Sequence, residues 1–429
     1  MPLLTLRGKK LADGVAALSY ESTVVLSSVL TFYVLYTQLG QSEYGVLVGV
    51  AGLSGTTTLC LTSWGQPWLL EAVMKRGRTL GDCAHRVVRL CVQAAVLCTL
   101  ITVGLGLVLV PRARLGVLIF GGLSDGLANG VAFALVGVIQ LRSTFVRATL
   151  TRTAIALVRP LAAGVLIVVD KLTLQTFVLT MSCLYIVVTG AIWFAVRRAL
   201  APEVNRIPLS VVAREGAPYG VVSFTWALQE DFDKTLLNTF GFVKDAATYA
   251  AGYKFVQMAT LPIKALVQAS HHRFLQVDDS PRTHLRRAYF LSTISAIYAL
   301  VATVGLLIGL HLLERFSGDT FEGAITPARY LAGLIILRSV VWYPFNGLLA
   351  FALASRRMLI LVGTSVLNLG LNLAFIPHFS WKAAVWSTYV TEVAFACACW
   401  ISLIKAVHVA ERSHGKHQRS HAPETEPEI

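Results

Sequence analysis

The stretch "WALQEDFDKTLLNTFG" (Trp226–Gly241) carries four charged residues within five positions. They are Glu230, Asp231, Asp233 and Lys234. Apolar residues flank them and continue beyond the stretch in both directions. A charge at the centre of a bilayer costs about 2.5–3.5 kcal/mol on insertion scales, so such side chains face a partner or water. The stretch therefore predicts a membrane-spanning helix that lines a polar interior.

The whole chain has the composition of a membrane protein. Of its 429 residues, 55% are hydrophobic and only 14% are charged, whereas soluble domains carry about 25% charged residues. Apolar runs of roughly 20 residues, the length that crosses a bilayer, recur along the chain. They predict spans at 15–38, 45–66, 88–110, 117–140, 153–169, 174–196, 216–240, 246–270, 288–310, 330–354, 358–377 and 382–405.

The hydrophilic loop 197–215 separates six spans from six. We therefore predict an all-α polytopic protein whose twelve helices form two pseudo-symmetric six-helix bundles around a central cavity. The predicted domains are an N-terminal lobe at 1–205, a C-terminal lobe at 206–408 and a disordered cytoplasmic tail at 409–429.

Basic residues orient these spans. With both termini in the cytoplasm, 25 Lys and Arg residues fall in cytoplasmic segments and 7 in the opposite ones. Cytoplasmic loops of membrane proteins carry such an excess, so we predict that both termini lie inside. The same asymmetry accounts for most of the net charge of +14. A nucleic-acid partner has no separate support.

Further charges occur inside the other predicted spans: Glu21, Arg159, Lys254, Lys264, Arg338 and Glu392. On a continuous helix Lys234 would pair with Glu230 at i,i+4 and with Asp231 at i,i+3. Asp233 would have no local cation, so the cluster would need basic residues from other spans. Two interpretations remain open, a structural network of ion pairs and the wall of a cavity that meets substrate or a coupling ion.

Proline and small polar residues mark candidate hinge and packing positions inside spans. Proline interrupts the hydrogen-bond ladder of a membrane helix, and asparagine joins neighbouring helices. The candidates are Pro160, Pro262, Pro344, Asn346, Asn368 and Asn372.

No sequence motif of an ATPase or hydrolase occurs in the chain. Asp231-Phe232-Asp233 matches the short D-x-D pattern of glycosyltransferases, but it lies within a predicted span. The seven cysteines contain no C-x-x-C pair, so neither a disulfide framework nor a zinc site is predicted. We predict a transporter rather than an enzyme, with no cofactor, no metal site and no catalytic residue.

Two segments resemble a known family. "LQEDFDKTLLNTFGFVKDAATYAAGYKFVQMATLPIKAL" resembles helices seven and eight of Wzx-type polysaccharide flippases, with Asp233-Lys234, Gly241, Tyr249 and Pro262 in the matching places. "LLAFALASRRMLILVGTSVLNLGLNLAFIPHFSWKAAVWSTYVTE" is similar to their helices ten to twelve. In that family the sequence YG-x-x-GAA follows a proline that corresponds to Pro377 here. This chain has "FSWKAAV" in its place, which is a departure in the outer loop.

The resemblance implies the MOP superfamily, which also contains the MATE exporters. It implies alternating-access translocation of a polyprenyl-pyrophosphate-linked oligosaccharide across the bacterial cytoplasmic membrane, for surface polysaccharide biosynthesis. Its implied partners are the lipid-linked glycan, membrane lipids and polysaccharide polymerase or export machinery. Lysine and arginine bind pyrophosphate, so Arg159, Lys254, Lys264 and Arg338 are the candidates for the headgroup.

The remaining intramembrane charges are candidates for the cavity wall or for ion coupling. They are Glu21, Glu230, Asp231, Asp233, Lys234 and Glu392. Two other functions remain open: a MATE-like exporter of cationic molecules, which the acidic residues of span 7 favour, and a membrane glycosyltransferase or polymerase. The glycan, the lipid carrier, the energy source and the oligomeric state are not determined by the sequence.

Overall fold

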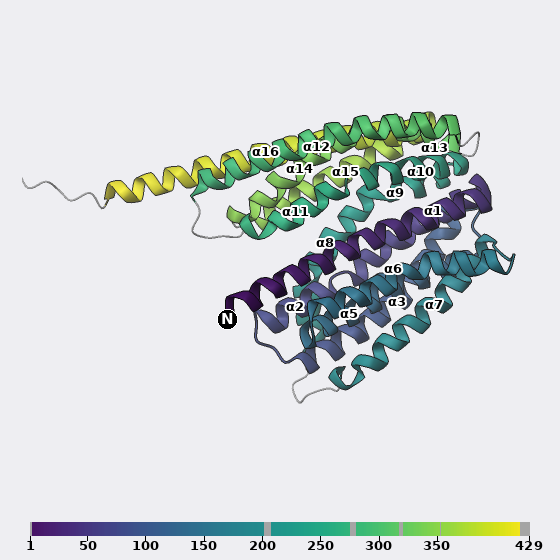
Figure 1. The fold of residues 1–429 in the computed structure, drawn as a ribbon, viewed down its shortest axis with the longest axis horizontal. Helices are drawn as coiled ribbons and strands as arrows, with labels where there is room; N and C mark the ends of the chain where they lie inside the picture. Colours follow the sequence, from purple (N-terminus) through teal and green to yellow (C-terminus); the bar gives the residue numbers. More distant parts are fainter. Residues whose placement is uncertain (1, 201–206, 275–279, 317–320, 352, 421–429) are drawn as a thin grey trace, which may run out of the picture.

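The computed structural model describes residues 2–200, 207–274, 280–316, 321–351 and 353–420, and all regular structure in them is helical (Figure 1). The first half forms α1 (Pro2–Thr62), α2 (Gly65–Met74), α3 (Leu80–Leu109), α4 (Leu115–Asp125), the π-helix η1 (Gly126–Ala132), α5 (Phe133–Arg142), α6 (Phe145–Val168), α7 (Leu174–Val196) and η2 (Arg197–Leu200). The second half forms α8 (Leu209–Glu230), α9 (Phe232–Thr239), α10 (Val243–Ala259), α11 (Leu261–Phe274), α12 (Pro281–Phe316), α13 (Glu322–Leu331), α14 (Leu334–Gly347), η4 (Leu348–Phe351), α15 (Ala354–Phe379) and α16 (Trp381–Ser420).

These helices account for all twelve predicted spans. Nine segments of the described chain are long and apolar enough to cross a membrane. The first contains two spans, because Gly40 adopts φ 75° inside α1, a conformation that glycine accepts at no steric cost. The pairs α8–α9 and α10–α11, broken at Asp231 and Thr260, supply the other two. The predicted fold class is confirmed, and the orientation of the termini stays a prediction.

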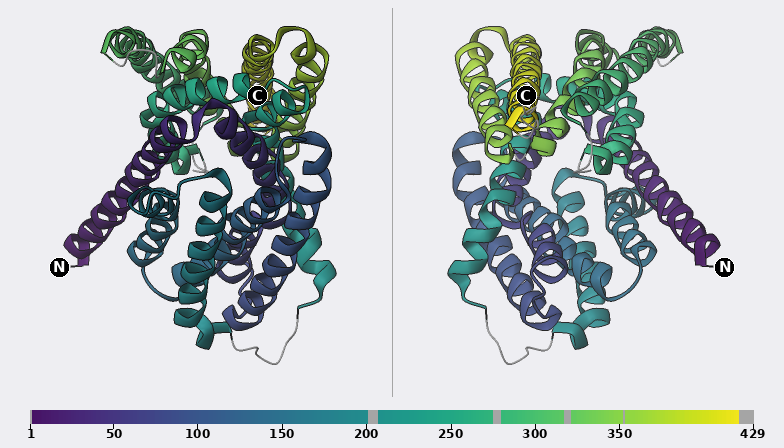
Figure 2. Two further views of the ribbon diagram at one scale, coloured as in Figure 1. Left: turned by 90° about the vertical axis from the view of Figure 1, so that its right-hand side faces the viewer. Right: turned by 90° about the vertical axis from the view of Figure 1, so that its left-hand side faces the viewer.

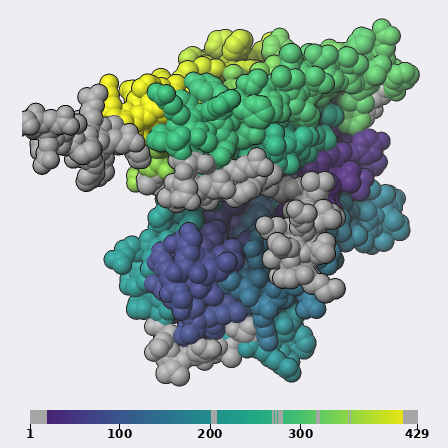
Figure 3. All heavy atoms as spheres, turned by 60° about the vertical axis from the view of Figure 1, so that its left-hand side comes forward, coloured from purple at the N-terminus to yellow at the C-terminus, as the bar shows by residue number. Residues whose placement is uncertain are grey.

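The two halves of the sequence form two layers of long helices. Helices α1–α7 make one layer and α9–α16 the other, with α8 running between them (Figure 1). The space-filling view shows the same division, with the green-to-yellow half above the purple-to-teal half (Figure 3). We call the layers the N-lobe and the C-lobe. Helix α16 extends to Ser420, and the predicted domain boundaries stay a prediction.

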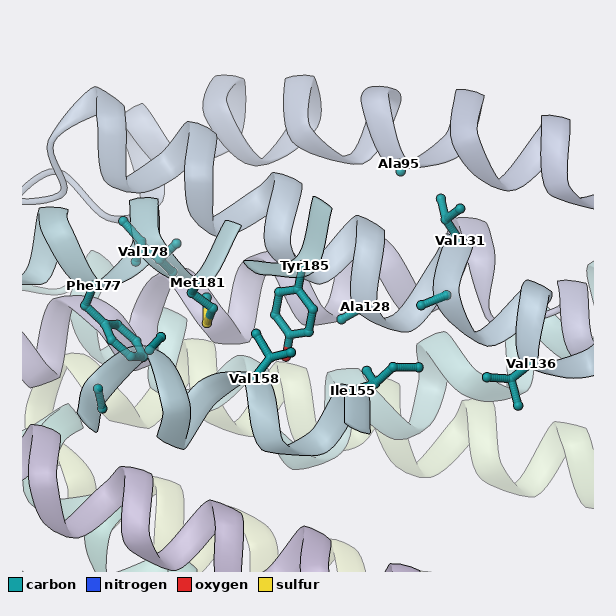
Figure 4. Close-up of a cluster of buried hydrophobic side chains, with 14 of the residues drawn as sticks. Ala95, Ala128, Val131, Val136, Ile155, Val158, Phe177, Val178, Met181 and Tyr185 are labelled. Carbon is teal, nitrogen blue, oxygen red and sulfur yellow. The ribbon is translucent and has the colours of Figure 1, made fainter. Parts of the chain in front are cut away.

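The core of the N-lobe is built from small and branched apolar side chains. Ala128 and Val131 of η1 face Ile155 and Val158 of α6 (Figure 4). Four side chains of α7 pack in the same cluster: Phe177, Val178, Met181 and Tyr185. Leu135, Val136 and Val138 of α5 are fully buried in the same cluster. Because these side chains fix α4–α7 against one another, the N-lobe positions any polar group that it carries on α4 or α6.

The lobes meet at the end where Gly40 and Gly241 turn the chain. Five aromatic side chains seal this end, and we call them the aromatic cluster: Phe32, Tyr36 and Tyr44 of α1, Phe255 of α10, and Phe321. Their ring centroids lie 5.4–6.3 Å apart. Toward the end where the termini lie, the ribbons of the lobes diverge (Figures 1 and 2).

Helix α8 belongs to both lobes. Near its start, Glu215 accepts two hydrogen bonds from Arg78, at 2.8 and 2.9 Å, and one from Trp68 Nε1 of α2 at 3.0 Å. Near its end, the backbone carbonyl of Thr225 accepts from Ser365 Oγ of α15 at 3.1 Å. The helix is therefore fastened to the N-lobe at one end and to the C-lobe at the other.

Candidate functional site

The seventh span is discontinuous, and its break lies inside the charged stretch. Helix α8 ends at Glu230, Asp231 has φ −129° and ψ −18°, and α9 begins at Phe232. Helix α1 packs against the break so closely that a Cβ atom on Gly52 would lie 2.5 Å from the Asp231 carbonyl oxygen. Thr235 Oγ1 also donates to the Gly49 carbonyl at 2.9 Å. Broken helices of this kind present backbone and side-chain groups to transported ions and molecules.

The break changes how Lys234 is paired. Its Nζ lies 2.7 Å from Asp231 Oδ1, which confirms the predicted i,i+3 pair. The predicted i,i+4 pair with the Glu230 carboxylate is wrong, because Lys234 Nζ donates instead to the Glu230 backbone carbonyl at 2.6 Å. The prediction that Asp233 lacks a local cation is also wrong: its Oδ1 lies 3.5 Å from Lys234 Nζ. Because α9 starts at Phe232, Asp233 lies in the first turn of this helix. Its carboxylate folds back toward the backbone N–H and the side chain of Lys234 in the same turn.

Asp233 is enclosed by the C-lobe. Its Oδ1 accepts the Lys234 backbone N–H at 2.8 Å, and its Oδ2 accepts the Tyr249 hydroxyl at 2.6 Å. The residue is buried, as is Tyr249. An acid with these contacts holds α9 against α10 and does not face the space between the lobes.

A second ion-pair group surrounds Arg338 on α14. Its Nε donates to Glu392 Oε1 at 2.9 Å, its Nη2 donates to the Tyr253 hydroxyl, and its Nη1 lies 3.8 Å from Glu230 Oε1. Tyr253 lies between the two groups, with Lys234 Nζ 4.8 Å from the ring centroid. Arg338 is 2% exposed, so among the four headgroup candidates it is the one that protein groups enclose.

The N-lobe presents one charge pair at the same depth. Arg159 Nη2 donates to Asp125 Oδ1 at 2.9 Å, and Ser54 Oγ donates to the other carboxylate oxygen. Asp125 ends α4 directly before the π-helix η1, and such helical insertions are frequent at functional sites. The carboxylate is buried, but the Arg159 side chain is 46% exposed.

Lys254 and Lys264 come from the C-lobe. Lys254 Nζ donates to Gln257 at 3.1 Å, and Lys264 Nζ lies 5.6 Å from the Trp342 ring centroid. Within the described chain, neither amine has a carboxylate within 4.0 Å. Four charged groups lie near enough to act on Lys254 electrostatically: Asp231, Lys234, Arg159 and Glu230.

Arg159, Asp231, Lys254 and Lys264 thus surround one region, which we call the interlobe space. Asp231 is 48% exposed, although it lies mid-span. Arg159 and Lys254 act on each other from opposite lobes. Two charged side chains of the interlobe space, Arg159 and Asp231, are thus about half exposed within the protein.

The hinge and packing candidates divide into two groups. Pro160 and Pro344 lie inside α6 and α14, and Pro262 follows the break at Thr260. The asparagines make hydrogen bonds: Asn368 donates to Thr391 of α16 at 3.3 Å, Asn372 donates to Asn368 at 2.9 Å, and Asn346 accepts from Arg357 at 3.4 Å. Glu21 is in α1, and its side chain lies outside the described part of the structure.

Three residues that complete these contacts were not among the site candidates predicted from the sequence, although Tyr249 matched a family position: Asp125, Tyr249 and Tyr253. Asp125 lies near a predicted span end, where a carboxylate needs no partner. Tyr249 and Tyr253 are four residues apart in the small-residue stretch "TYAAGY", and this spacing puts both hydroxyls on one helix face. That pattern, next to a span with four charges, is the signal that could have identified them.

Solved structures share this fold. An outward-facing multidrug-resistance MATE-family transporter of the MOP superfamily superposes with a TM-score of 0.63 at 10% identity, covering 94% of this chain and 96% of that one. A eukaryotic MATE transporter gives 0.56 at 15% identity, covering 96% and 99%. A MOP-superfamily transporter from Pyrococcus furiosus, described as having a binding pocket of reversed polarity that suggests a different function, gives 0.56 at 13% identity, covering 95% and 93%.

No protein-family model and no curated protein matches the sequence. At these identities, the structural likeness establishes the fold alone. The chain has the two-lobed, all-helical architecture of the MOP-superfamily transporters.

Proposed function

We propose that this chain, with the fold of MOP-superfamily transporters, is a membrane transporter that moves a lipid-linked oligosaccharide across the bilayer by alternating access. The proposed headgroup is a polyprenyl diphosphate, and the proposed location is the bacterial cytoplasmic membrane. The observation that carries the proposal is that two basic side chains on opposite lobes, Arg159 and Lys254, are near enough to act on each other electrostatically. Cations on both lobes suit a ligand with several negative charges.

The unpaired amines support an anionic ligand. A buried or half-buried ammonium without a carboxylate is costly, and binding an anion relieves that cost. Lys254 has an amide as its hydrogen-bond partner, and Lys264 lies over an aromatic ring. A diphosphate between Arg159 and Lys254 would satisfy both lobes at once.

Flipping in proteoliposomes tests the proposal. The purified protein should move a fluorescent polyprenyl-diphosphate oligosaccharide between leaflets, and Lys254→Ala should slow this movement about tenfold or more. One charge-assisted hydrogen bond contributes about 1.5–3 kcal/mol, and each 1.4 kcal/mol is a factor of ten. Lys382→Ala, which removes an exposed lysine at the start of α16, should leave the rate unchanged. Equal rates for wild type and Lys254→Ala would contradict the headgroup assignment.

Export of organic cations is a second candidate function, because Asp231 exposes a carboxylate in the same space. The same proteoliposomes, loaded with a fluorescent lipophilic cation instead, separate the two functions. Cation movement that Asp231→Asn abolishes, without movement of the lipid-linked glycan, would favour cation export.

A further inference from the structure

Helices α12 and α16 run side by side along the C-lobe, and we call the line between them the α12–α16 seam (Figure 1). Tyr289 of α12 stacks on Trp400 of α16, with ring centroids 4.6 Å apart. Nearer the end where the termini lie, Arg282 of α12 contacts Glu411 of α16. Between these two contacts the residue numbers fall in α12 and rise in α16, so the helices are antiparallel.

Exposed basic residues gather at this end of the seam. Arg286 of α12 and Lys405 of α16 both lie between the two contacts, and therefore at one level of the seam. Arg282 lies on the same face of α12 as Arg286, four residues away, and Arg412 lies on the same face of α16 as Lys405, seven residues away. All four side chains are exposed.

One carboxylate opposes these four cations in the described part of the two helix ends, 281–290 and 400–412. It is Glu411, which contacts Arg282. Asp278 and Asp279 lie outside the described residues and are left out of this count. Among the described residues, the other three cations have no carboxylate within 4.0 Å. The seam end therefore has an excess of positive charge.

The aromatic contact marks the depth of the lipid headgroups. Tryptophan and tyrosine concentrate where a membrane helix passes from hydrocarbon to water. On the side of Tyr289 and Trp400 away from the termini, the helices expose apolar side chains such as Phe290 and Val393. Trp400 Nε1 donates to the Val340 carbonyl at 3.0 Å, which fixes the ring in place. The four cations thus lie at headgroup level, on the predicted cytoplasmic side.

We propose that this end of the α12–α16 seam binds the headgroup of an anionic phospholipid. The phosphate lies between Arg286 and Lys405, and the acyl chains follow the apolar surface beyond Tyr289. Guanidinium and ammonium groups form charge-assisted hydrogen bonds with phosphate oxygens. Basic groups between membrane helices on the cytoplasmic side attract anionic headgroups. Lipid binding at this surface is independent of the ligand of the interlobe space.

The charge of the headgroup and its depth both favour this occupant. A phosphatidylcholine headgroup carries its own ammonium group, which the four cations repel, whereas phosphatidylglycerol has a net negative charge. A soluble anion would contact the cations alone. A phospholipid also covers exposed apolar side chains of the same two helices, such as Phe290 at 64% exposure.

Native mass spectrometry of the full-length protein in detergent tests the proposal, with dioleoylphosphatidylglycerol as the probe. The wild type should bind this lipid about tenfold or more tightly than dioleoylphosphatidylcholine. The double variant Arg286→Gln/Lys405→Gln should bind it about 30-fold more weakly, and each single variant about fivefold more weakly. Its affinity for dioleoylphosphatidylcholine should stay as in the wild type.

A matched double variant is the control. Arg315→Gln/Lys382→Gln removes two exposed basic residues at the opposite ends of the same two helices, and it should bind the anionic lipid as the wild type does. Arg286→Lys/Lys405→Arg keeps both charges and should keep the affinity within about threefold. Glycerol 3-phosphate, which lacks acyl chains, should bind at least tenfold more weakly than the lipid.

Three outcomes would overturn the site. They are an unchanged affinity in the Arg286→Gln and Lys405→Gln single variants, an equal loss in the control double variant, and equal affinities for the lipid and glycerol 3-phosphate. The last of these would assign the cations to a soluble anion.

Discussion

Glu215 shows how a single residue outside the spans fastens two elements. Arg78 donates two hydrogen bonds to its carboxylate, Trp68 adds a third, and these contacts hold the pKa of Glu215 below its usual range. A carboxyl whose pKa is lowered by folding contributes stability above its unfolded pKa. That contribution is lost as the pH falls through the folded pKa.

The stability of the Glu215→Gln variant should therefore depend less on pH than that of the wild type. Between about pH 5 and pH 3 the wild-type Tm should fall faster than that of the variant, because protonation breaks the contact between α8 and α2. Differential scanning fluorimetry in detergent measures both curves. Glu322→Gln, at an exposed position in α13, serves as the control and should follow the wild type. Parallel curves for wild type and Glu215→Gln would contradict this role.

At the scale of elements, the contact between α1 and the helices α9 and α10 depends on glycine. A Cβ atom on Gly45 would collide with the carbonyl oxygen of Val243 and approach its Cγ1 to 2.8 Å. A Cβ on Gly49 would collide with the Asn238 side chain. The close approach allows Asn238 Nδ2 to donate to the Gly45 carbonyl at 2.9 Å. The seal between the lobes thus begins with backbone packed directly on backbone.

Gly45→Ala should destabilise the protein by about 1–3 kcal/mol, because the extra methyl group overpacks this contact. Gly104→Ala is the matched control, since Gly104 lies in α3 with open space around it. Alanine there should stabilise the helix by up to about 1 kcal/mol. Chemical unfolding in detergent measures the change in the free energy of unfolding for each variant. An unchanged free energy in Gly45→Ala would show that α1 can shift without cost.

At the scale of the whole molecule, the aromatic cluster joins the two lobes at one end, and the ribbons of the lobes diverge toward the other end (Figures 1 and 2). Phe321 contacts three rings of α1, with centroid distances to Phe32, Tyr33 and Tyr36 of 6.3, 5.8 and 5.8 Å. The alternating access that we propose would require these rings to separate when the closed end opens. The cluster is then part of the free-energy difference between the two states.

Phe321→Ala should shift the population toward opening at this end, because removing a buried aromatic side chain costs about 3–5 kcal/mol in the closed state. Spin labels at Lys171→Cys and Lys244→Cys, exposed positions on the two lobes, report the separation by double electron–electron resonance. The distance distribution should move to longer values. Phe290→Ala removes an exposed phenylalanine of α12 and should leave the distribution as in wild type. An unchanged distribution in Phe321→Ala would assign the seal to other contacts.

The sequence by itself determined the class of protein, the twelve spans and the presence of charge at bilayer depth. These properties follow from local composition, because about 20 apolar residues cross a bilayer whatever their neighbours are. It also identified the Asp231–Lys234 pair, whose partners are three residues apart.

Only the tertiary structure decided which charges are paired and which face the interlobe space. Glu230 pairs with Arg338 across helices, Arg159 pairs with Asp125, and Arg338 is enclosed by protein groups. These pairings join segments far apart in the chain. The break at Asp231 lies where α1 approaches closely at Gly52. Helical spacing along one span contains none of this information, because it is set by the packing of other spans.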